Sequence, residues 1–224
     1  MNAIAVLMQR IGYAFRDETL LETALTHRSA KSNNNERMEF LGDSILSYFI
    51  SIELYQRFPE ATEGELSRLR ASLVKGETLG KIAAELELSE YLVMGTGELK
   101  SGGYRRSSTM ADAFEAIIGA IYLDGGFDAA QDFVKRFFTE RLDECDPRNA
   151  QKDPKTRLQE FMQAQSRPLP EYEVVETQGK AHNQTFRVSC RVDNLQELFY
   201  GTGTSRRKAE QMAANAALEV LEND

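Results

Sequence analysis

The spacing of apolar residues changes near residue 150, and this change limits the possible folds more than any other feature of the chain. From Asp17 to about Leu142 the apolar residues recur at helical intervals, and no segment there alternates convincingly as a strand would. Beyond residue 150 three short segments favour strands, most clearly residues 185–192, where apolar and polar residues alternate. The change predicts an all-helical domain followed by a smaller domain that combines helices with strands.

A polar segment separates the two halves. Residues 145–154, CDPRNAQKDP, are short, mostly polar and include two prolines, which is typical of a joint between domains. A chain of 224 residues is also long enough for two domains. We therefore expect a first domain over residues 1–145, a linker over 146–153 and a second domain over 154–224.

Two helices are prominent in the predicted first domain. Apolar residues nearly encircle the segment 36–58, which indicates a buried central helix that Pro59 ends. A second helix is expected to begin at Ser107 or Ser108, with one of these serines as its N-cap, and to stop before the glycine pair at 125–126.

The predicted second domain has the order helix, strand, strand, strand, helix. Asp153 as N-cap and Pro154 at the first helical position begin its first helix. The strand candidates are 172–177, 185–192 and 197–202, and the last helix is 206–221. We expect an antiparallel sheet with both helices on one face. The residues expected to be buried on the last helix are Ala209, Met212, Ala213, Ala216 and Val220.

Charge and cysteine content give weaker indications. The net charge is −8, of which residues 1–150 contribute −7 and residues 151–224 contribute −1. Because phosphate contacts are local, this balance does not exclude a nucleic-acid partner. No apolar run approaches the roughly 18–20 residues of a membrane span, so no membrane association is expected. The two cysteines, Cys145 and Cys190, suit a reducing cytosol, and we expect a cytoplasmic protein.

Acidic residues interrupt both prominent helices at helical spacing. Glu36, Glu39 and Asp43 share one face of the first helix, and Asp112 and Glu115 repeat the arrangement on the second. Two like charges about 4 Å apart repel by roughly 4 kcal/mol at an effective dielectric constant near 20. Such clusters therefore require protonation, arginine partners or a cation.

Two interpretations of these acids remain open at this point. Oxygen ligands without cysteine or clustered histidine favour Mg²⁺ or Mn²⁺ over zinc. Alternatively, the acids form a solvated helix face whose ion-pair partners are Arg37 and Arg105 or Arg106.

The segment 35–46, NERMEFLGDSIL, resembles the signature of the ribonuclease III family. Four further blocks of the chain resemble the family in the same order. They are THRS at 26–29, EGELSRLRA at 63–71, GELKSGGYRRSS at 97–108 and ADAFEAIIGAIYLDGG at 111–126. The resemblance implies an all-α nuclease domain that forms a homodimer.

The resemblance also implies roles for individual residues. The metal ligands would be Glu39, Asp43, Asp112 and Glu115, with Asp43 and Glu115 as the catalytic residues. Glu36 and Glu63 would be additional acids of the cleft, and Phe40 would pack across the dimer interface. Asn34 stands where many members have histidine, outside the ligand set. For His27 in the THRS block, a structural hydrogen bond is favoured over a direct catalytic role.

Arg206, Arg207 and Lys208 lie in the first turn of the last predicted helix, where the helix dipole disfavours cations. A bound phosphate would resolve this conflict, although a solvated basic turn is the alternative. Residues 153–163, 179–190 and this turn resemble an α-β-β-β-α double-stranded RNA-binding domain. The RNA contacts implied by the resemblance are Thr156, Gln159, Glu160, His182, Arg206, Arg207 and Lys208.

Together these features predict a Mg²⁺-dependent endoribonuclease, with Mn²⁺ as a substitute ion, that cleaves double-stranded RNA. The products would carry 5′-phosphate and 3′-hydroxyl ends, and the expected role is processing of ribosomal, messenger and transfer RNA. Two alternatives compete with this interpretation. One is a non-cleaving double-stranded RNA-binding dimer, and the other is a helical enzyme that acts on diphosphates through acid-bound magnesium.

Overall fold

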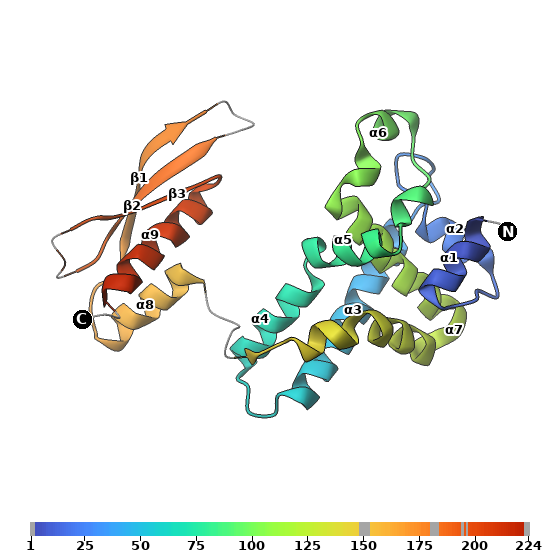
Figure 1. Cartoon of the computed structure of the whole chain (residues 1–224), viewed down its shortest axis with the longest axis horizontal. Coiled ribbons are helices and arrows are strands. Elements are labelled where there is room, and N and C mark those ends of the chain that lie inside the picture. Colours follow the sequence, from blue (N-terminus) through green and yellow to red (C-terminus); the bar gives the residue numbers. More distant parts are fainter. Residues whose placement is uncertain (1–2, 148–152, 180–183, 194, 196, 222–224) are drawn as a thin grey trace. The chain divides into compact units, whose positions relative to one another are not determined.

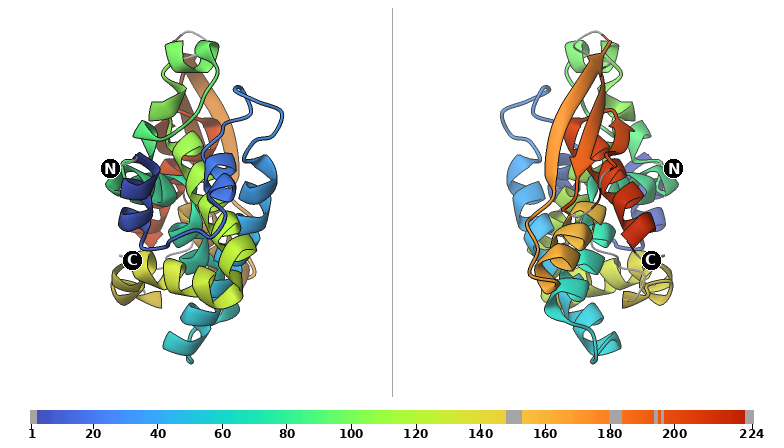
Figure 2. Two further views of the ribbon diagram at one scale, coloured as in Figure 1. Left: turned by 90° about the vertical axis from the view of Figure 1, so that its right-hand side faces the viewer. Right: turned by 90° about the vertical axis from the view of Figure 1, so that its left-hand side faces the viewer.

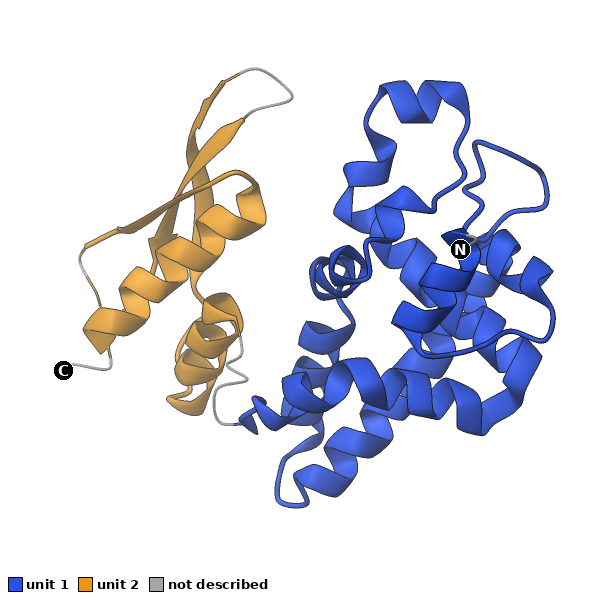
Figure 3. Cartoon of the chain, turned by 45° about the vertical axis from the view of Figure 1, so that its right-hand side comes forward, with its two compact units in different colours: residues 1–150 blue, residues 151–224 orange. Residues whose placement is uncertain are grey.

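The computed structural model describes residues 3–147, 153–179, 184–193, 195 and 197–221. These residues form two compact units, which span residues 1–150 and 151–224 (Figure 3). Among the described residues, no helix is both long enough and apolar enough to cross a bilayer.

The first unit consists of helices, as predicted. Its described residues form no strand, and their β-type pairing is limited to one isolated bridge between Thr26 and Val93. The α-helices are α1 (Ala3–Ile11), α2 (Glu18–Ala24), α3 (Glu36–Arg57), α4 (Glu63–Val74), α5 (Gly76–Glu85), α6 (Thr96–Lys100) and α7 (Ser107–Asp143). Two short 3₁₀ helices, η1 (Leu88–Glu90) and η2 (Gly103–Arg105), precede and follow α6.

Helices α3 and α7 pack against each other at the centre of the first unit (Figure 1). The packing is close enough to bring the two helix backbones into contact at two glycines. A methyl group at Gly42 would overlap the carbonyl oxygen of Glu115, and one at Gly119 would overlap the carbonyl oxygen of Met38. The two glycines therefore bring the acid-bearing faces of α3 and α7 together.

The predicted glycine stop in α7 is confirmed, but its serine cap is not. Gly126 has φ +82°, so the helical conformation is interrupted there. At the start of α7, Arg106 occupies the N-cap position without a side-chain cap hydrogen bond. The hydroxyl of Ser107 instead donates to the carbonyl of Gly76 at 3.0 Å. A contact with α5 has thus replaced a local cap.

The prediction that α3 is buried on most sides is wrong. Helix α3 ends at Arg57, and Phe58 is its C-cap. Helix α3 exposes three aromatic residues: Phe40 is 77% exposed, Tyr55 is 74% exposed and Tyr48 is 51% exposed. The apolar residues around α3 are of types that are often buried, but the other helices of this chain cover only some of them.

The second unit is a three-stranded antiparallel sheet with two helices on one face (Figures 1 and 2). Its elements are α8 (Pro154–Ala164), β1 (Glu171–Gln178), β2 (Thr185–Arg191), β3 (Phe199–Gly203) and α9 (Arg206–Leu221). In the register of the sheet, Cys190 of β2 pairs with Tyr172 of β1 and Phe199 of β3. As predicted, Pro154 begins α8 and the carboxylate of Asp153 accepts from the backbone N–H of Thr156.

The buried face of α9 differs from the prediction. Its buried residues are Ala209, Ala213, Ala214, Ala217 and Leu218, whereas Met212 is 57% exposed and Ala216 and Val220 are half-buried. The cause lies in β3, where a methyl group at Gly201 would overlap the backbone of α9. Because the helix lies this close to the strand, small residues face the sheet and the long Met212 side chain lies outside.

Candidate functional site

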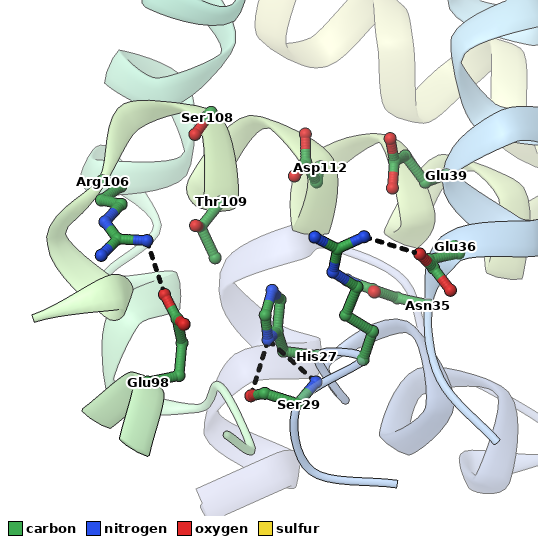
Figure 4. Close-up of a pocket in the computed structure, with 11 residues that line it drawn as sticks. His27, Ser29, Asn35, Glu36, Glu39, Glu98, Arg106, Ser108, Thr109 and Asp112 are labelled. Carbon is green, nitrogen blue, oxygen red and sulfur yellow. Dashed lines mark hydrogen bonds and ion pairs between the residues drawn. The ribbon is translucent and has the colours of Figure 1, made fainter. Parts of the chain in front are cut away.

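A polar pocket of about 670 Å³ lies in the first unit, between the loop around His27, the start of α3 and the start of α7 (Figure 4). Asp112 and Glu39 lie at one end of the pocket, and Glu98 and Arg106 lie at the other. The complete lining is His27, Arg28, Ser29, Asn35, Glu36, Glu39, Glu98, Arg106, Ser108, Thr109 and Asp112.

Three carboxylates from α3 and α7 converge beside this pocket, and two of them, Glu39 and Asp112, line it. One oxygen each of Glu39, Asp112 and Glu115 lies within 4.8 Å of the others, and all three side chains are half-buried. The fourth predicted ligand, Asp43, is exposed and lies outside this group of three. Its charge nevertheless acts on Glu115 and Glu39, so it lies near the cluster.

Burial and mutual repulsion disfavour the charged forms of these acids. Burial raises the pKa of Glu115 to about 8, and the charges of Asp43, Glu39 and Asp112 contribute to this rise in that order. Burial and then the charge of Asp112 raise the pKa of Glu39. Burial also raises the pKa of Asp112, although the charges of His27 and Arg28 oppose this.

Among the described residues, no ion pair neutralises the three converging carboxylates. Arg106, one of the partners considered above, donates instead to Glu98 at 2.7 Å. Arg105 lies over the ring of Tyr104, with its guanidinium carbon 5.2 Å from the ring centroid. A set of half-buried carboxylate oxygens without a cationic partner fits a hard divalent cation, whose charge would stabilise the ionised forms.

The two additional acids lie in different places. Glu36 lines the pocket and forms an ion pair with Arg28 at 3.5 Å. Glu63, at the start of α4, lines a separate pocket of about 460 Å³ and accepts a hydrogen bond from Ser67 at 2.7 Å. Within one chain, the structure therefore brings Glu36 to the acid cluster but not Glu63.

Sequence patterns assigned no role in the pocket to Glu98, Ser108 or Thr109, which lie in its lining. The carboxylate of Glu98 packs where a side chain on Gly103 would be, and there it binds Arg106. Glu98, Arg106 and Ser108 lie in the GELKSGGYRRSS block, whose resemblance to the family was the only sequence feature that pointed to these three residues. Nothing in its spacing indicated that this loop would line the opposite end of the pocket that holds Glu39 and Asp112.

The predicted RNA contacts of the second unit that the structure describes lie in the first two turns of α8 and in the first turn of α9. Arg206, Arg207 and Lys208 are all exposed at the start of α9. On α8, Gln159 and Glu160 are exposed, whereas the hydroxyl of Thr156 donates to Asp153 at 2.9 Å. The remaining predicted contact, His182, lies outside the described residues.

Comparison with known proteins identifies relatives of both units. Residues 17–142 match the Ribonuclease-III-like family, and residues 154–221 match the Double-stranded RNA binding motif. The chain is 56% identical to Ribonuclease 3 of Glaesserella parasuis over 96% of each chain. It is 55% identical to Ribonuclease 3 of Vibrio cholerae over 97% of this chain and 96% of the relative.

A solved structure agrees with these matches. The nuclease domain of ribonuclease III from Campylobacter jejuni superposes with a TM-score of 0.62 and 42% identity, over 65% of this chain and all of that one. The helical unit with its acid cluster, the α-β-β-β-α unit and the full-length similarity together lead to one conclusion. This chain is a member of the ribonuclease III family.

Proposed function

We propose that the chain is a magnesium-dependent endoribonuclease that cleaves double-stranded RNA. The observation that carries the proposal is the convergence of Glu39, Asp112 and Glu115, whose half-buried carboxylates lie within 4.8 Å of one another. Their raised pKa values are the expected result of placing acids together without a cation. The double-stranded RNA binding motif of the second unit supports the choice of substrate.

Glu39, Asp43, Asp112 and Glu115 would hold the ion, with Asp43 and Glu115 as the catalytic residues. Carboxylate oxygens suit Mg²⁺, and Mn²⁺ would be an effective substitute. When bound, the metal would supply Lewis-acid chemistry that activates water and stabilises negative charge on the departing 3′ oxygen. The packing of α3 against α7 would hold these ligands at a fixed spacing, and Arg28 and Arg106, which form ion pairs with Glu36 and Glu98, would contact the RNA backbone in the same pocket.

In the second unit, Arg206, Arg207 and Lys208 would bind phosphates at the start of α9. The backbone N–H groups of a helix start add to this attraction for anions. Thr156, Gln159 and Glu160 on α8, together with His182, would contact the minor groove, where 2′-hydroxyl groups distinguish RNA from DNA. We keep 1–145, 146–153 and 154–224 as our proposed limits for the nuclease domain, the linker and the RNA-binding domain.

We also propose that the chain acts as a homodimer through the exposed face of α3. Phe40, Tyr48 and Tyr55 are exposed aromatic residues of the kind that marks protein interfaces. The ring of Phe127 lies beside that of Tyr48, with the ring centroids 5.8 Å apart. A second solved nuclease domain of ribonuclease III from Campylobacter jejuni, 43% identical to this chain, is described as flexible in a region involved in dimer formation. A twofold pair would supply one acid cluster for each strand of a duplex.

Phe40→Arg tests the homodimer. The substitution places a charge in the proposed apolar interface, so sedimentation should change from dimer to monomer and duplex cleavage should fall with it. Tyr104→Arg, a half-buried aromatic residue in η2 rather than α3, serves as the control and should remain dimeric. An active Phe40→Arg dimer would contradict this assignment of the interface.

The decisive experiment for the activity is incubation of the purified chain with long duplex RNA, with and without Mg²⁺. We expect cleavage only with the metal, and products with 5′-phosphate and 3′-hydroxyl ends. Binding without cleavage at any Mg²⁺ or Mn²⁺ concentration would support the non-cleaving alternative. The cytoplasm is the proposed location, and structured ribosomal, messenger and transfer RNA precursors are the proposed substrates.

A further inference from the structure

His27 lines the acid pocket, and one side of its imidazole ring is occupied by local hydrogen bonds. The backbone N–H of Ser29 donates to His27 Nδ1 at 3.2 Å, and the Ser29 hydroxyl lies 2.8 Å from the same nitrogen. Figure 4 shows that the other ring nitrogen, Nε2, points away from Ser29 and into the pocket. Nδ1 therefore forms hydrogen bonds within the loop, and Nε2 faces the pocket.

These contacts determine the tautomer of the ring. A backbone N–H can only donate, so Nδ1 must act as an acceptor and the proton of the neutral ring resides on Nε2. A proton added at Nδ1 would face the N–H of Ser29. His27 therefore presents Nε2–H as a donor in a fixed direction, towards the pocket.

The loop around His27 is also anchored by hydrogen bonds that do not involve Nε2 of the imidazole. The backbone N–H of His27 donates to Val93 at 2.9 Å, and the N–H of Val93 donates to Leu25 at 2.9 Å. The hydroxyl of Ser29 accepts the backbone N–H of Gly95 at 3.0 Å. Among the hydrogen bonds of the described residues none involves Nε2, so the direction of Nε2–H calls for a partner inside the pocket.

The pocket indicates the chemistry of that partner. Arg28 and Arg106 line it together with His27, each arginine in an ion pair with Glu36 or Glu98, so N–H donors share this space with the acids. A phosphodiester needs this combination, because its non-bridging oxygens accept hydrogen bonds while a cation at the acids screens its charge. RNA supplies such groups along its backbone.

We propose that His27 is a substrate-binding residue of this cleft, and that its Nε2–H donates to a non-bridging phosphate oxygen of the RNA strand. The inference rests on the proposed function, because it requires RNA to lie against the acid cluster. It assigns His27 the role of a hydrogen-bond donor in a fixed position.

Three substitutions test the donor. His27→Gln can place an amide N–H near the position of Nε2, whereas the shorter His27→Asn places its amide near Nδ1 and is the matched control. We expect kcat/KM for a short RNA duplex to fall about 10- to 100-fold in His27→Ala and His27→Asn, the usual effect of losing a hydrogen bond to a charged group. His27→Gln should recover most of this loss, and Tm and directly measured Mn²⁺ binding should stay unchanged.

Phosphorothioate substrates identify the acceptor. Sulfur replaces one non-bridging oxygen, in separate Rp and Sp substrates, at the scissile linkage and at the two linkages on either side. At the contacted oxygen, sulfur should slow the wild-type protein more than His27→Ala, because the variant has no donor to lose. A difference at the scissile linkage places the contact on the reacting phosphate, and a difference at a neighbouring linkage places it on the adjacent backbone.

Two outcomes would overturn the inference. One is an equal sulfur effect in the wild-type protein and His27→Ala at every linkage. The other is a loss of activity that follows a fall in Tm and that His27→Gln does not recover. Glu115→Gln, assayed in parallel, separates this failure from that of the proposed function. If Glu115→Gln is inactive while the His27 variants are normal, only the proposed role of His27 is wrong. If Glu115→Gln cleaves normally, the proposed metal site is wrong as well.

Discussion

The two units each gather charges of one sign, but in opposite environments. In the first unit, Glu39, Asp112 and Glu115 are half-buried between α3 and α7. In the second, Arg206, Arg207 and Lys208 are exposed at the start of α9. Burial raises the pKa of each of the three acids, whereas water surrounds the three cations.

This difference shows how burial decides what a charge cluster requires. Charges in water are screened, so the basic turn is tolerated even at the helix end that disfavours it. Half-buried acids lack this screening, and the packing energy of α3 and α7 must hold them together until a cation binds. We therefore expect changes at the acids to affect chemistry and folding, and changes at the basic turn to affect affinity alone.

Glu115→Gln should have the largest effect. It keeps the shape of the side chain but removes a charged oxygen ligand, so duplex cleavage should fall more than about 100-fold, beyond the loss usual when only a hydrogen-bond partner of a metal ligand is changed. Binding of duplex RNA should remain nearly normal. Cleavage kinetics at limiting Mg²⁺ measure the loss of activity, and a direct Mn²⁺ titration measures the loss of metal affinity. Glu140→Gln on the exposed side of α7 is the control, and normal turnover by Glu115→Gln would refute the ligand assignment.

Replacement of Arg206, Arg207 and Lys208 by alanine should weaken duplex binding about 10- to 100-fold, almost equally for unrelated sequences, because phosphate contacts do not read bases. The logarithmic salt dependence should flatten by roughly one unit for each lost contact. Cleavage at low salt and high RNA concentration should persist. Arg187→Ala with Arg191→Ala, on exposed positions of β2, is the control. An unchanged salt slope in the triple variant would make the basic turn a solvated surface.

Gly42→Ala probes the packing that holds the acids together. The added methyl group would overlap the carbonyl of Glu115, so α3 and α7 must separate and the metal ligands with them. We expect a loss of about 1–3 kcal/mol in unfolding free energy and weaker Mn²⁺ binding. Gly76→Ala is the matched control, because its methyl group would meet only Ala111 at 3.9 Å. Unaltered metal affinity in Gly42→Ala would show that the glycine serves folding alone.

Metal-free protein should also show a pH dependence of stability. The pKa of Glu115 rises from 4.5 to about 8 on folding, so between these pH values the folded state keeps a proton that the unfolded chain releases. Stability from this group is therefore complete below pH 4.5 and is lost as pH rises towards 8. In EDTA, the Tm of the wild-type protein should decrease relative to Glu115→Gln over this range. If Tm changes with pH in the same way in the wild-type protein and in Glu115→Gln, Glu115 is not a buried carboxyl without a cationic partner.

The sequence by itself determined the order and type of the elements. Hydrophobic period predicted helices before residue 145, and the alternation in 185–192 predicted a strand. These predictions succeeded because helix and strand patterns repeat within a few residues of one segment. The same short-range logic placed Glu36, Glu39 and Asp43 on one helix face, and Asp112 and Glu115 on another.

Tertiary structure alone decided which of these faces meet and what surrounds them. It joined Glu39 to Asp112 and Glu115, kept Glu63 in a separate pocket, exposed Phe40 and turned Nε2 of His27 into the cleft. It also turned Met212 outward, because Gly201 brings α9 against β3. All of these features have the same physical cause. Each depends on the distance between segments remote in the chain, and the periodicity of one segment carries no information about that distance.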